Sequence, residues 1–343
     1  MLDHLKQLTT ARFVWIGSRE GMEKALVEAH GVEFIGIPSG KLRRYFSWKN
    51  LTDLLKILQG YFLAKKIFQQ LQPSVVFSKG GFVSVPPVWA ARTLKIPVIS
   101  HESDFDPGLA TKLNLNSSRW VCVPYPESVQ YFPEKVRDRL LVTGNPVRSD
   151  FLHAKPNNLR KTWSVPEGAP LVIVLGGSLG AVSLNELIKA RLNAWAGKIA
   201  VIHQTGKDWT PPPASNWYHP IPFVSQEMPQ LYAAADLVIA RAGAGTLWEA
   251  CAVQVPLLLI PLEVGSRGDQ VRNAQYFAER GAAEFWTPSE GEEALDQKIQ
   301  SLLEDPDQQT RLKSAQQAFA AGNAAEVIAQ RILSCTEKAP LVR

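Results

Sequence analysis

Short apolar runs rich in β-branched residues alternate along the chain with longer segments whose apolar residues recur every three or four positions. The short runs predict strands, and the longer segments predict amphipathic helices. We expect strands at residues 13–16, 33–37, 74–77, 98–100, 120–123, 140–143, 171–175, 200–203, 237–240, 257–260 and 283–286. Runs such as 171–175 are apolar at every position, which is typical of parallel sheets covered on both faces by helices. The expected fold class is therefore α/β, with doubly wound parallel sheets.

The length of 343 residues suits two domains. Between residues 145 and 166 the sequence turns polar and gains prolines, which indicates the junction. We predict one Rossmann-like domain over residues 1–147 and a second over 148–320. The segment 321–343 contains a helix, at about 324–333, that is expected to return to the first domain. In such folds ligands bind at the carboxyl ends of the strands, here expected to face a cleft.

Composition narrows the class of protein. Hydrophobic residues at 45% and charged residues at 20% exclude a disordered or fibrous chain. Three cysteines are too few for a disulfide framework, and no apolar run approaches the ~20 residues that span a bilayer. The net charge of +5 permits an anionic partner such as phosphate or an acidic membrane, but it does not require nucleic acid, which we do not expect as a partner.

A glycine cluster, Gly176-Gly177-Ser178-Leu179-Gly180, follows the strand at 171–175 and precedes a helix from about Val182. Glycines let the backbone approach a ligand closely, and amides at a helix start favour phosphate. The alternative is a tight turn that binds nothing. The cluster lacks the Gly-Lys-Ser/Thr of a Walker A loop, and the next strand ends in His203-Gln204 rather than in the acid of a dinucleotide site.

A second glycine turn, Arg241-Ala-Gly243-Ala-Gly245-Thr246, follows the strand at 237–240, with Glu249 one helical turn further on. Thr246 and the backbone amides suit phosphate, and Glu249 suits a ribose diol. The alternative is a capping box formed by Thr246 and Glu249. Two such turns in one half favour a nucleotide diphosphate.

Two further segments carry polar groups at strand ends. Asp269 and Gln270 have side chains that can form hydrogen bonds with sugar hydroxyls. The alternative is that they are the polar residues at the start of a helix. In the first half, Lys79-Gly80-Gly81-Phe82 follows one strand, and His101-Glu102-Ser103-Asp104 follows the next. His101, Glu102 and Asp104 are the candidates for a general base. The alternative is a helix N-cap cluster at Asp106-Pro107.

Metal-binding patterns are weak. Asp104-Phe-Asp106 matches a short metal-holding pattern found on nucleotide-sugar enzymes, but three-residue patterns recur by chance. The remaining histidines and the cysteines show no metal-ligand spacing. We therefore expect no metal and no cofactor.

The stretch 41–66 is basic, aromatic and amphipathic, with seven basic residues against one acid. This composition is typical of a surface that docks on a membrane. Leu55, Leu58, Tyr61 and Lys65 are the predicted contacts. The alternative is a helix with one face in the core and a solvated basic side.

These motifs together resemble the MurG family, the UDP-N-acetylglucosamine transferases that convert lipid I to lipid II in bacterial peptidoglycan synthesis. They occur in the family's order from about residue 12 to 290: Ile16-Gly-Ser-Arg19, Lys79-Gly-Gly-Phe82-Val-Ser84, His101-Glu102, Gly144-Asn-Pro-Val-Arg148, Gly176-Gly-Ser-Leu-Gly-Ala181, His203-Gln-Thr-Gly206, Arg241-Ala-Gly243 through Glu249, and Gln270 with Asn273-Ala274.

The resemblance implies a GT-B glycosyltransferase, with two Rossmann-like domains, no metal and inversion at the transferred sugar. The residues that it assigns to the sugar donor are Arg148, Phe223 and Val224 at the uracil, Gly177, Ser178, Gly245 and Thr246 at the diphosphate, Glu249 at the ribose, and Asp269 and Gln270 at the sugar. Those that it assigns to the acceptor are Gly80, Gly81, Phe82 and His101. The stretch 41–66 matches the family's membrane-facing region.

The implied activity is transfer of N-acetylglucosamine from UDP-GlcNAc to the muramoyl 4-hydroxyl of a polyprenyl-diphosphate acceptor, by a peripheral protein at the cytoplasmic face of the membrane. Two alternatives stay open: a GT-B transferase with another lipid or glycan acceptor, and a catalytically impaired UDP-sugar-binding subunit. The chain departs from the family at Ser103 and Asp104, where Gln and Asn are usual, and at Asp269, where one of two glutamines is usual.

The beginning of the chain also departs from the family. A helix at residues 2–8 leads directly into the strand at 13–16, whereas doubly wound domains begin with a strand. The family's first strand and its Gly-Gly-Thr-Gly-Gly-His loop, which carries the usual base, have no counterpart. We expect the natural product to carry roughly 20–25 further residues, and the chain as written to bind UDP-GlcNAc but to transfer it poorly.

Overall fold

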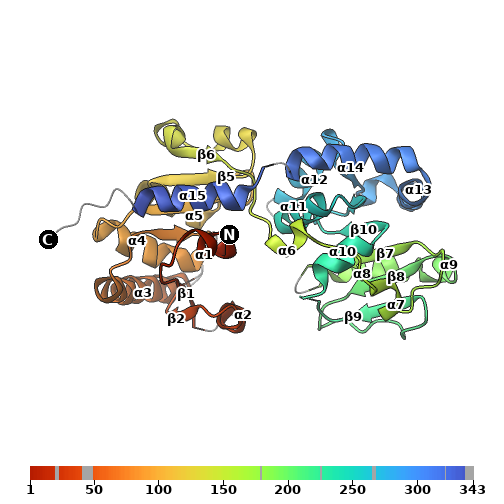
Figure 1. Cartoon of the computed structure of the whole chain (residues 1–343), viewed down its shortest axis with the longest axis horizontal. Coiled ribbons are helices and arrows are strands. Elements are labelled where there is room, and N and C mark those ends of the chain that lie inside the picture. Colours follow the sequence, from red (N-terminus) through yellow and green to blue (C-terminus); the bar gives the residue numbers. More distant parts are fainter. Residues whose placement is uncertain are drawn as a thin grey trace. The chain divides into compact units, whose positions relative to one another are not determined.

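The computed structural model of the chain describes residues 1–19, 23–40, 49–177, 180–224, 226–264, 268–320 and 322–336, with the backbone alone at 49–51 (Figure 1). The chain divides into two compact units. The first consists of Met1–Gly144 with Ala324–Arg343, and the second is Asn145–Asn323. The boundaries fall after residues 144 and 323, where the sequence predicted 147 and 320. The segment at the C-terminus accordingly belongs to the first unit.

The described residues of the first unit form two parallel sheets. One pairs β1 (Val14–Ser18) with β2 (Glu33–Ile37), and the other has the order β3 (Val76–Ser78), β4 (Val98–His101), β5 (Trp120–Val123), β6 (Leu140–Val142). The α-helices of this unit are α1 (Leu2–Leu8), α2 (Glu23–Ala29), α3 (Lys49–Leu71), α4 (Val85–Thr93), α5 (Leu109–Asn114) and α15 (Ala324–Thr336). A short 3-10 helix, η1 (Phe82–Ser84), leads into α4.

Two apolar clusters hold the first unit together. In one, α3 and α4 pack against β2 and β4 through side chains that include Ile37, Ala64 and Val88. In the other, Leu5 of α1 and Ile328 of α15 share a cluster with Ile99 of β4. The helices α1 and α15, from opposite ends of the sequence, therefore lie side by side, as the red α1 and the blue α15 show in Figure 1.

The second unit is built on one parallel sheet of six strands in the described residues, and their order is β12-β11-β10-β7-β8-β9. In chain order the strands are β7 (Leu171–Leu175), β8 (Ala200–Gln204), β9 (Tyr218–Ile221), β10 (Leu237–Ala240), β11 (Leu257–Leu259) and β12 (Glu284–Phe285). The helices are α6 (Ser149–Leu152), α7 (Leu159–Thr162), α8 (Val182–Lys189), α9 (Leu192–Trp195), α10 (Met228–Ala234), α11 (Ala244–Val253), α12 (Asp269–Glu279), α13 (Glu292–Glu304) and α14 (Pro306–Ala320).

The central strands β7 and β10 are buried at every position, as the continuous apolar run at 171–175 predicted. The side chains of alternate residues enter opposite layers because successive residues of a strand point to opposite faces. Val172 and Val174 join one cluster with Leu184 of α8 and Ile239 of β10. The expected fold class, α/β with parallel sheets, is thus the observed one.

The strand β9 was not predicted. Pro220 lies inside it, paired in register with His203 of β8, and a proline lowers the strand signal because it has no N–H to donate. β9 is tolerated because it is the edge strand of the sheet, where one side of the backbone needs no partner. The other predicted strands occur within a few residues of their expected bounds.

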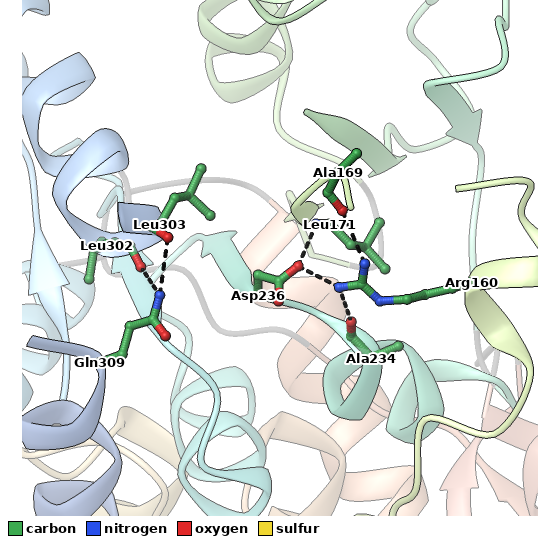
Figure 2. A network of polar contacts seen from close by, with 8 residues as sticks. All are labelled: Arg160, Ala169, Leu171, Ala234, Asp236, Leu302, Leu303 and Gln309. Carbon is green, nitrogen blue, oxygen red and sulfur yellow. Dashed lines mark hydrogen bonds and ion pairs between the residues drawn. The ribbon is translucent and has the colours of Figure 1, made fainter. Parts of the chain in front are cut away.

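A polar network fixes the starts of two neighbouring strands in the second unit (Figure 2). The carboxylate of Asp236, which directly precedes β10, accepts a hydrogen bond of 2.7 Å from the backbone N–H of Leu171, the first residue of β7. The same carboxylate pairs with the guanidinium of Arg160. Arg160 also donates to the carbonyls of Ala169 and Ala234. The network therefore holds β7 and β10 in register before the apolar core begins.

The turn between α13 and α14 has a similar device, also drawn in Figure 2. The side-chain amide of Gln309 donates to the carbonyls of Leu302 and Leu303, at 2.8 and 3.3 Å. Carbonyls in the last turn of a helix have no partner within the helix, so Gln309 satisfies part of the end of α13.

Candidate functional site

The carboxyl ends of β7, β8 and β10 meet at one edge of the second sheet, because the three strands are parallel neighbours. We call the turns at this edge the second-unit edge. They are residues 176–177 and 180 after β7, residues 204–206 at the end of β8, and residues 241–246 after β10. Both glycine turns that the sequence singled out therefore lie there. Ser178, the predicted diphosphate contact, lies outside the described residues.

Glycine is required at two positions of the first turn. Gly177 and Gly180 have φ values of +86° and +78°, in the left-handed region. A Cβ on Gly180 would also lie 2.3 Å from the carbonyl oxygen of Thr205. The turn after β7 is thus packed directly on the end of β8, which leaves no room for a side chain.

Gln204 links this turn to the predicted uracil contacts. Its amide donates to the carbonyl of Gly177 at 3.0 Å, and its Oε1 accepts from the backbone N–H of Val224 at 3.0 Å. Gln204 is 4% exposed, whereas the neighbouring Phe223 is half exposed. No contact was predicted for Gln204, although a polar residue at the end of an apolar strand is a signal that could have indicated one.

We expect Gln204→Ala to weaken binding of UDP and of UDP-GlcNAc equally, by about 2- to 10-fold, because the loss of about 0.5–1.5 kcal/mol in hydrogen bonding would loosen the nucleotide site that the sequence predicts for both ligands. Isothermal titration calorimetry with both ligands measures this. The matched control is Gln230→Ala on the neighbouring α10. Unchanged affinity in Gln204→Ala would show that the link is unnecessary for binding.

The second turn is not a capping box. α11 begins at Ala244 after the N-cap Gly243, so Thr246 is the third helical residue and cannot cap. The hydroxyl of Tyr232, on α10, instead hydrogen-bonds the Thr246 side chain. The amides in the first turn of α11 therefore have no side-chain cap, and Gly245 in this turn is exposed.

Glu249 and Arg148 lie together. The Arg148 Nε is 3.3 Å from a carboxylate oxygen of Glu249, and the Arg148 guanidinium stacks 4.6 Å from the ring centroid of Phe151. Burial raises the pKa of Glu249, while the charge of Arg148 opposes that rise. The structure thus brings together the residues predicted for ribose and uracil, 101 positions apart in the chain.

Asp269 and Gln270 begin α12, as the alternative interpretation of a polar helix start also expected. Asp269 is 7% exposed and pairs with Arg272 at 2.6 Å, and Gln270 accepts from the backbone N–H of Leu262 at 2.9 Å. Asn273, one turn further on, donates to the carbonyl of Ala242 at 3.1 Å and so ties α12 to the turn after β10. No role in the site was predicted for Asn273 from its residue type and position.

His203 is buried and structural. Its Nε2 lies 3.0 Å from Asn185 Oδ1, and its Nδ1 lies 3.2 Å from the Tyr218 hydroxyl. Burial lowers the pKa of His203 to about 4, so the ring is neutral at physiological pH. Asn185 in turn donates to the carbonyl of Thr205, which connects α8 to the end of β8.

In the first unit, Lys79 directly follows β3, and His101 is the last residue of the neighbouring strand β4. The amine of Lys79 is 3.0 Å from His101 Nδ1 and 2.8 Å from the Ser103 hydroxyl, and we call these residues the Lys79–His101 cluster. His101 is fully buried, and its Nε2 lies 3.3 Å from the carbonyl oxygen of Gly144. Burial and the charge of Lys79 hold the pKa of His101 well below its usual range.

Gly80 and Gly81 follow Lys79 with φ values of +93° and +77°, which only glycine adopts readily. Phe82 begins η1 directly after them and is exposed. The predicted acceptor residues Gly80, Gly81 and His101 therefore lie at one edge of the sheet, but His101 itself has no exposed surface.

Glu102 organises the loop after β4. Its two carboxylate oxygens accept hydrogen bonds from the backbone N–H groups of Ser103, Asp104 and Gly108 and from the Thr111 hydroxyl. The N-cap of α5 is Gly108, so the expected helix start at Asp106-Pro107 is wrong by two residues. With both oxygens engaged, Glu102 is poorly placed to accept a substrate proton in this geometry; Asp104 is half-buried beside it.

The helix α3 has one buried and one exposed face. Ile57, Ala64 and Phe68 lie in the core, whereas four apolar side chains on the opposite face are 45–65% exposed: Leu54, Leu55, Leu58 and Phe62. We call these four the α3 patch. Tyr61 lies at the edge of the core instead, with its hydroxyl 3.0 Å from Thr93 Oγ1 of α4, and Lys65 is half-buried. The basic residues at 41–48 lie outside the described residues.

Within the part of the chain that the structure describes, no group of three or more His, Cys, Asp or Glu side chains is arranged to hold a metal ion. None of the helices described is long and apolar enough to cross a membrane.

Comparison with known proteins decides the family. The C-terminal domain of glycosyltransferase family 28 matches residues 171–332, and its N-terminal domain matches residues 1–120. The UDP-N-acetylglucosamine–N-acetylmuramyl-(pentapeptide) pyrophosphoryl-undecaprenol N-acetylglucosamine transferase of Treponema denticola is 42% identical over 297 residues, which are 80% of this chain and 76% of that protein. The chain belongs to the MurG family.

Further relatives agree with this assignment. The transferase of the same name from Clostridium botulinum is 44% identical over 270 residues, 78% of this chain and 75% of that protein. The crystal structure of Acinetobacter baumannii MurG has a TM-score of 0.70 and 25% identity, and it covers 97% of this chain and 93% of its own. The fold is accordingly of the GT-B class, with one parallel α/β sheet system in each unit, as the resemblance implied.

Proposed function

We propose that this MurG-family chain transfers N-acetylglucosamine from UDP-GlcNAc to lipid I and so forms lipid II in peptidoglycan synthesis. Relatives at 42–44% identity are named for this activity. The observation in the structure that supports it is the second-unit edge, where two glycine turns and Glu249 lie at the carboxyl ends of adjacent parallel strands. This is the position at which doubly wound folds bind nucleotides.

The residues of the second-unit edge suit a nucleotide diphosphate. The amides at the starts of α8 and α11, together with Ser178 and Thr246, would hold the two phosphates. Arg148, with the backbone at Phe223 and Val224, would hold the uracil. These amides would also stabilise the charge that develops on the departing UDP, with inversion at the sugar carbon. Glu249 would accept hydrogen bonds from the ribose, and Asp269 and Gln270 from the sugar. No metal or other cofactor is part of this proposal.

The first unit is proposed to take the acceptor. Gly80, Gly81 and Phe82 form an exposed turn at the carboxyl ends of β3 and β4, next to the Lys79–His101 cluster. The α3 patch, with Lys56 and Lys66 on the same helix, would rest on the cytoplasmic face of the membrane and so bring the chain to a polyprenyl-diphosphate lipid.

Replacing Leu58 and Phe62 of the α3 patch by serine is expected to reduce binding to vesicles that contain anionic lipid by about tenfold or more, because each large apolar side chain contributes about 1.5–3 kcal/mol when it leaves water. Co-sedimentation measures this. UDP affinity should not change. The control is Leu26→Ser on α2, where the exposed fraction of the leucine lies between those of Leu58 and Phe62. If the wild type, the double variant and Leu26→Ser sediment equally with the vesicles, α3 does not contact the membrane.

The activity is tested with the full chain, UDP-GlcNAc and a lipid I analogue, and with diacylglycerol as a second acceptor. Formation of the disaccharide lipid with release of UDP supports the proposal. Transfer to diacylglycerol alone would establish a different acceptor, and UDP-GlcNAc binding without transfer to any acceptor would establish an impaired sugar-nucleotide-binding protein.

A further inference from the structure

The Lys79–His101 cluster fixes the proton on His101. The Nε2 atom of His101 lies 3.3 Å from the carbonyl oxygen of Gly144, and a carbonyl oxygen can only accept. Nε2 therefore carries the ring proton, and Nδ1 presents its lone pair to the Lys79 amine at 3.0 Å. His101 has no exposed surface, so both of its nitrogens are committed within the protein.

The same geometry leaves one position open on Lys79. Among the described residues its amine has two hydrogen-bond partners, His101 Nδ1 and the Ser103 hydroxyl, and it donates to both. A neutral amine has two N–H donors and one lone pair. When both donors are used, the lone pair is the only remaining position. The amine lies in partly buried surroundings beside His101, although the lysine side chain as a whole is exposed.

We propose that the Lys79 amine is the base that accepts the proton of the acceptor hydroxyl in the transfer reaction. The inference rests on the proposed function and assigns a catalytic residue to it. The hydroxyl proton passes to the lone pair of Nζ while the hydroxyl oxygen forms a bond to C1 of N-acetylglucosamine. The bond from C1 to the phosphate oxygen breaks, and UDP leaves with its electron pair. Lys79 then returns the proton to water.

The electrostatic surroundings of Lys79 support this role. Burial lowers its pKa to about 8, although the carboxylates of Glu102 and Asp104, and to a lesser extent Cys122, oppose the shift. In the part of the chain that the structure describes, the titratable groups that face it are therefore these three and His101, from β4, the loop after β4, and β5. A lysine with this pKa is a free amine in an appreciable fraction of molecules near neutral pH, which suits a base. The oxygens of Glu102, by contrast, are already engaged by four hydrogen-bond donors.

The test measures kcat and KM of the full chain with UDP-GlcNAc and a lipid I analogue between pH 6 and 9.5. The variants are Lys79→Met, which removes the amine, Lys79→Arg, which keeps a positive charge but cannot act as a base, and Lys79→Ala with added ethylamine. Lys112→Met, an exposed lysine on α5, is the control. UDP affinity and thermal unfolding are measured for every variant to show that each is folded.

We expect kcat to fall about 10²- to 10⁴-fold in both the Met and the Arg variants, with little change in KM for the lipid. The wild-type kcat should rise with pH to a plateau with a midpoint near 8, and the Met variant should lose this dependence. Ethylamine should restore activity to Lys79→Ala in proportion to its free-base concentration.

Full activity of Lys79→Arg, or a rise in KM with kcat retained, would overturn the inference, because charge and not proton transfer would then be the contribution of Lys79. A wild-type kcat that does not vary with pH would overturn it as well. These outcomes presuppose wild-type transfer to the lipid I analogue. If the wild-type chain shows none, the proposed function fails, and with it the inference that rests on it.

Discussion

Glu249→Ala should weaken the binding of UDP and of UDP-GlcNAc alike, by about 10- to 150-fold. The ribose is common to both ligands, and loss of hydrogen bonds to a charged acceptor costs roughly 1.5–3 kcal/mol. Calorimetry with each ligand measures the two affinities. Glu249→Gln is the matched variant: it keeps one acceptor oxygen without the charge and should fall between the wild type and Glu249→Ala.

The surroundings of Glu249 add a pH dependence to this prediction. Burial raises the pKa of the carboxyl, so it takes up a proton at a higher pH than an ordinary glutamate, despite the nearby Arg148. Since the charged form is the better acceptor, UDP affinity of the wild type should fall as pH is lowered toward this raised pKa. Glu249→Gln should not show that fall. UDP affinity of Glu249→Ala within twofold of the wild type would remove Glu249 from the ribose site.

A substitution at the proposed sugar contact should separate the two ligands. Asp269→Asn should lower the affinity for UDP-GlcNAc but leave the affinity for UDP unchanged, because UDP lacks the sugar that Asp269 is proposed to contact. Asparagine keeps an oxygen that can face Arg272, which is 2.6 Å from the Asp269 carboxylate in the wild type. Equal losses for both ligands would show that the substitution disturbs the nucleotide site as a whole.

Acidification should destabilise the second unit through His203. The pKa of His203 is lowered from 6.5 to about 4 by burial, so below pH 6.5 the unfolded chain takes up a proton that the folded chain does not. Above pH 6.5, His203 therefore does not change the free energy of unfolding with pH. As pH decreases from 6.5 to 4, the free energy of unfolding falls by about 3 kcal/mol in all.

Hydrogen exchange of the β8 amides between pH 4 and 7.5, corrected for intrinsic exchange rates, measures this loss in the second unit. His203→Gln should begin from a lower stability at pH 7.5, since it loses hydrogen bonds to Asn185 or Tyr218, but it should lose less on acidification. His153→Gln replaces an exposed histidine of the same unit and should behave as the wild type. The prediction is contradicted if wild type and His203→Gln lose equal stability between pH 6.5 and 4.

Local sequence determined most of the elements of this protein. The run at 171–175 is apolar at every position, and only a central strand covered on both sides buries all of it. The glycines at 80, 81, 177 and 180 predicted turns, and in the structure each has a left-handed φ that only glycine adopts readily. The parallel sheet predicted from the sequence also led us to expect ligand binding at the carboxyl ends of its strands, where the turns after β7 and β10 lie.

What the sequence could not determine depends on contacts between distant residues. The strand β9 exists in spite of Pro220 because it pairs with β8 at the edge of the sheet, and the position of a strand within a sheet has no local signal. Similarly, a period of three or four residues on α3 did not show which face is buried; packing on α4 and β2 decided that Tyr61 lies near the core and Phe62 is exposed.

The chemistry of the site also depends partly on the sequence and partly on the tertiary structure. Residue types at or shortly after strand ends were enough to predict His101, Glu102 and Glu249 as site residues. The tertiary structure decided that Lys79 donates to His101 across 22 positions of sequence, that four donors engage Glu102, and that Gln204 joins the turn after β7 to Val224. Protonation and hydrogen bonding depend on which groups come within about 3 Å of one another, and folding brings them together from distant parts of the chain.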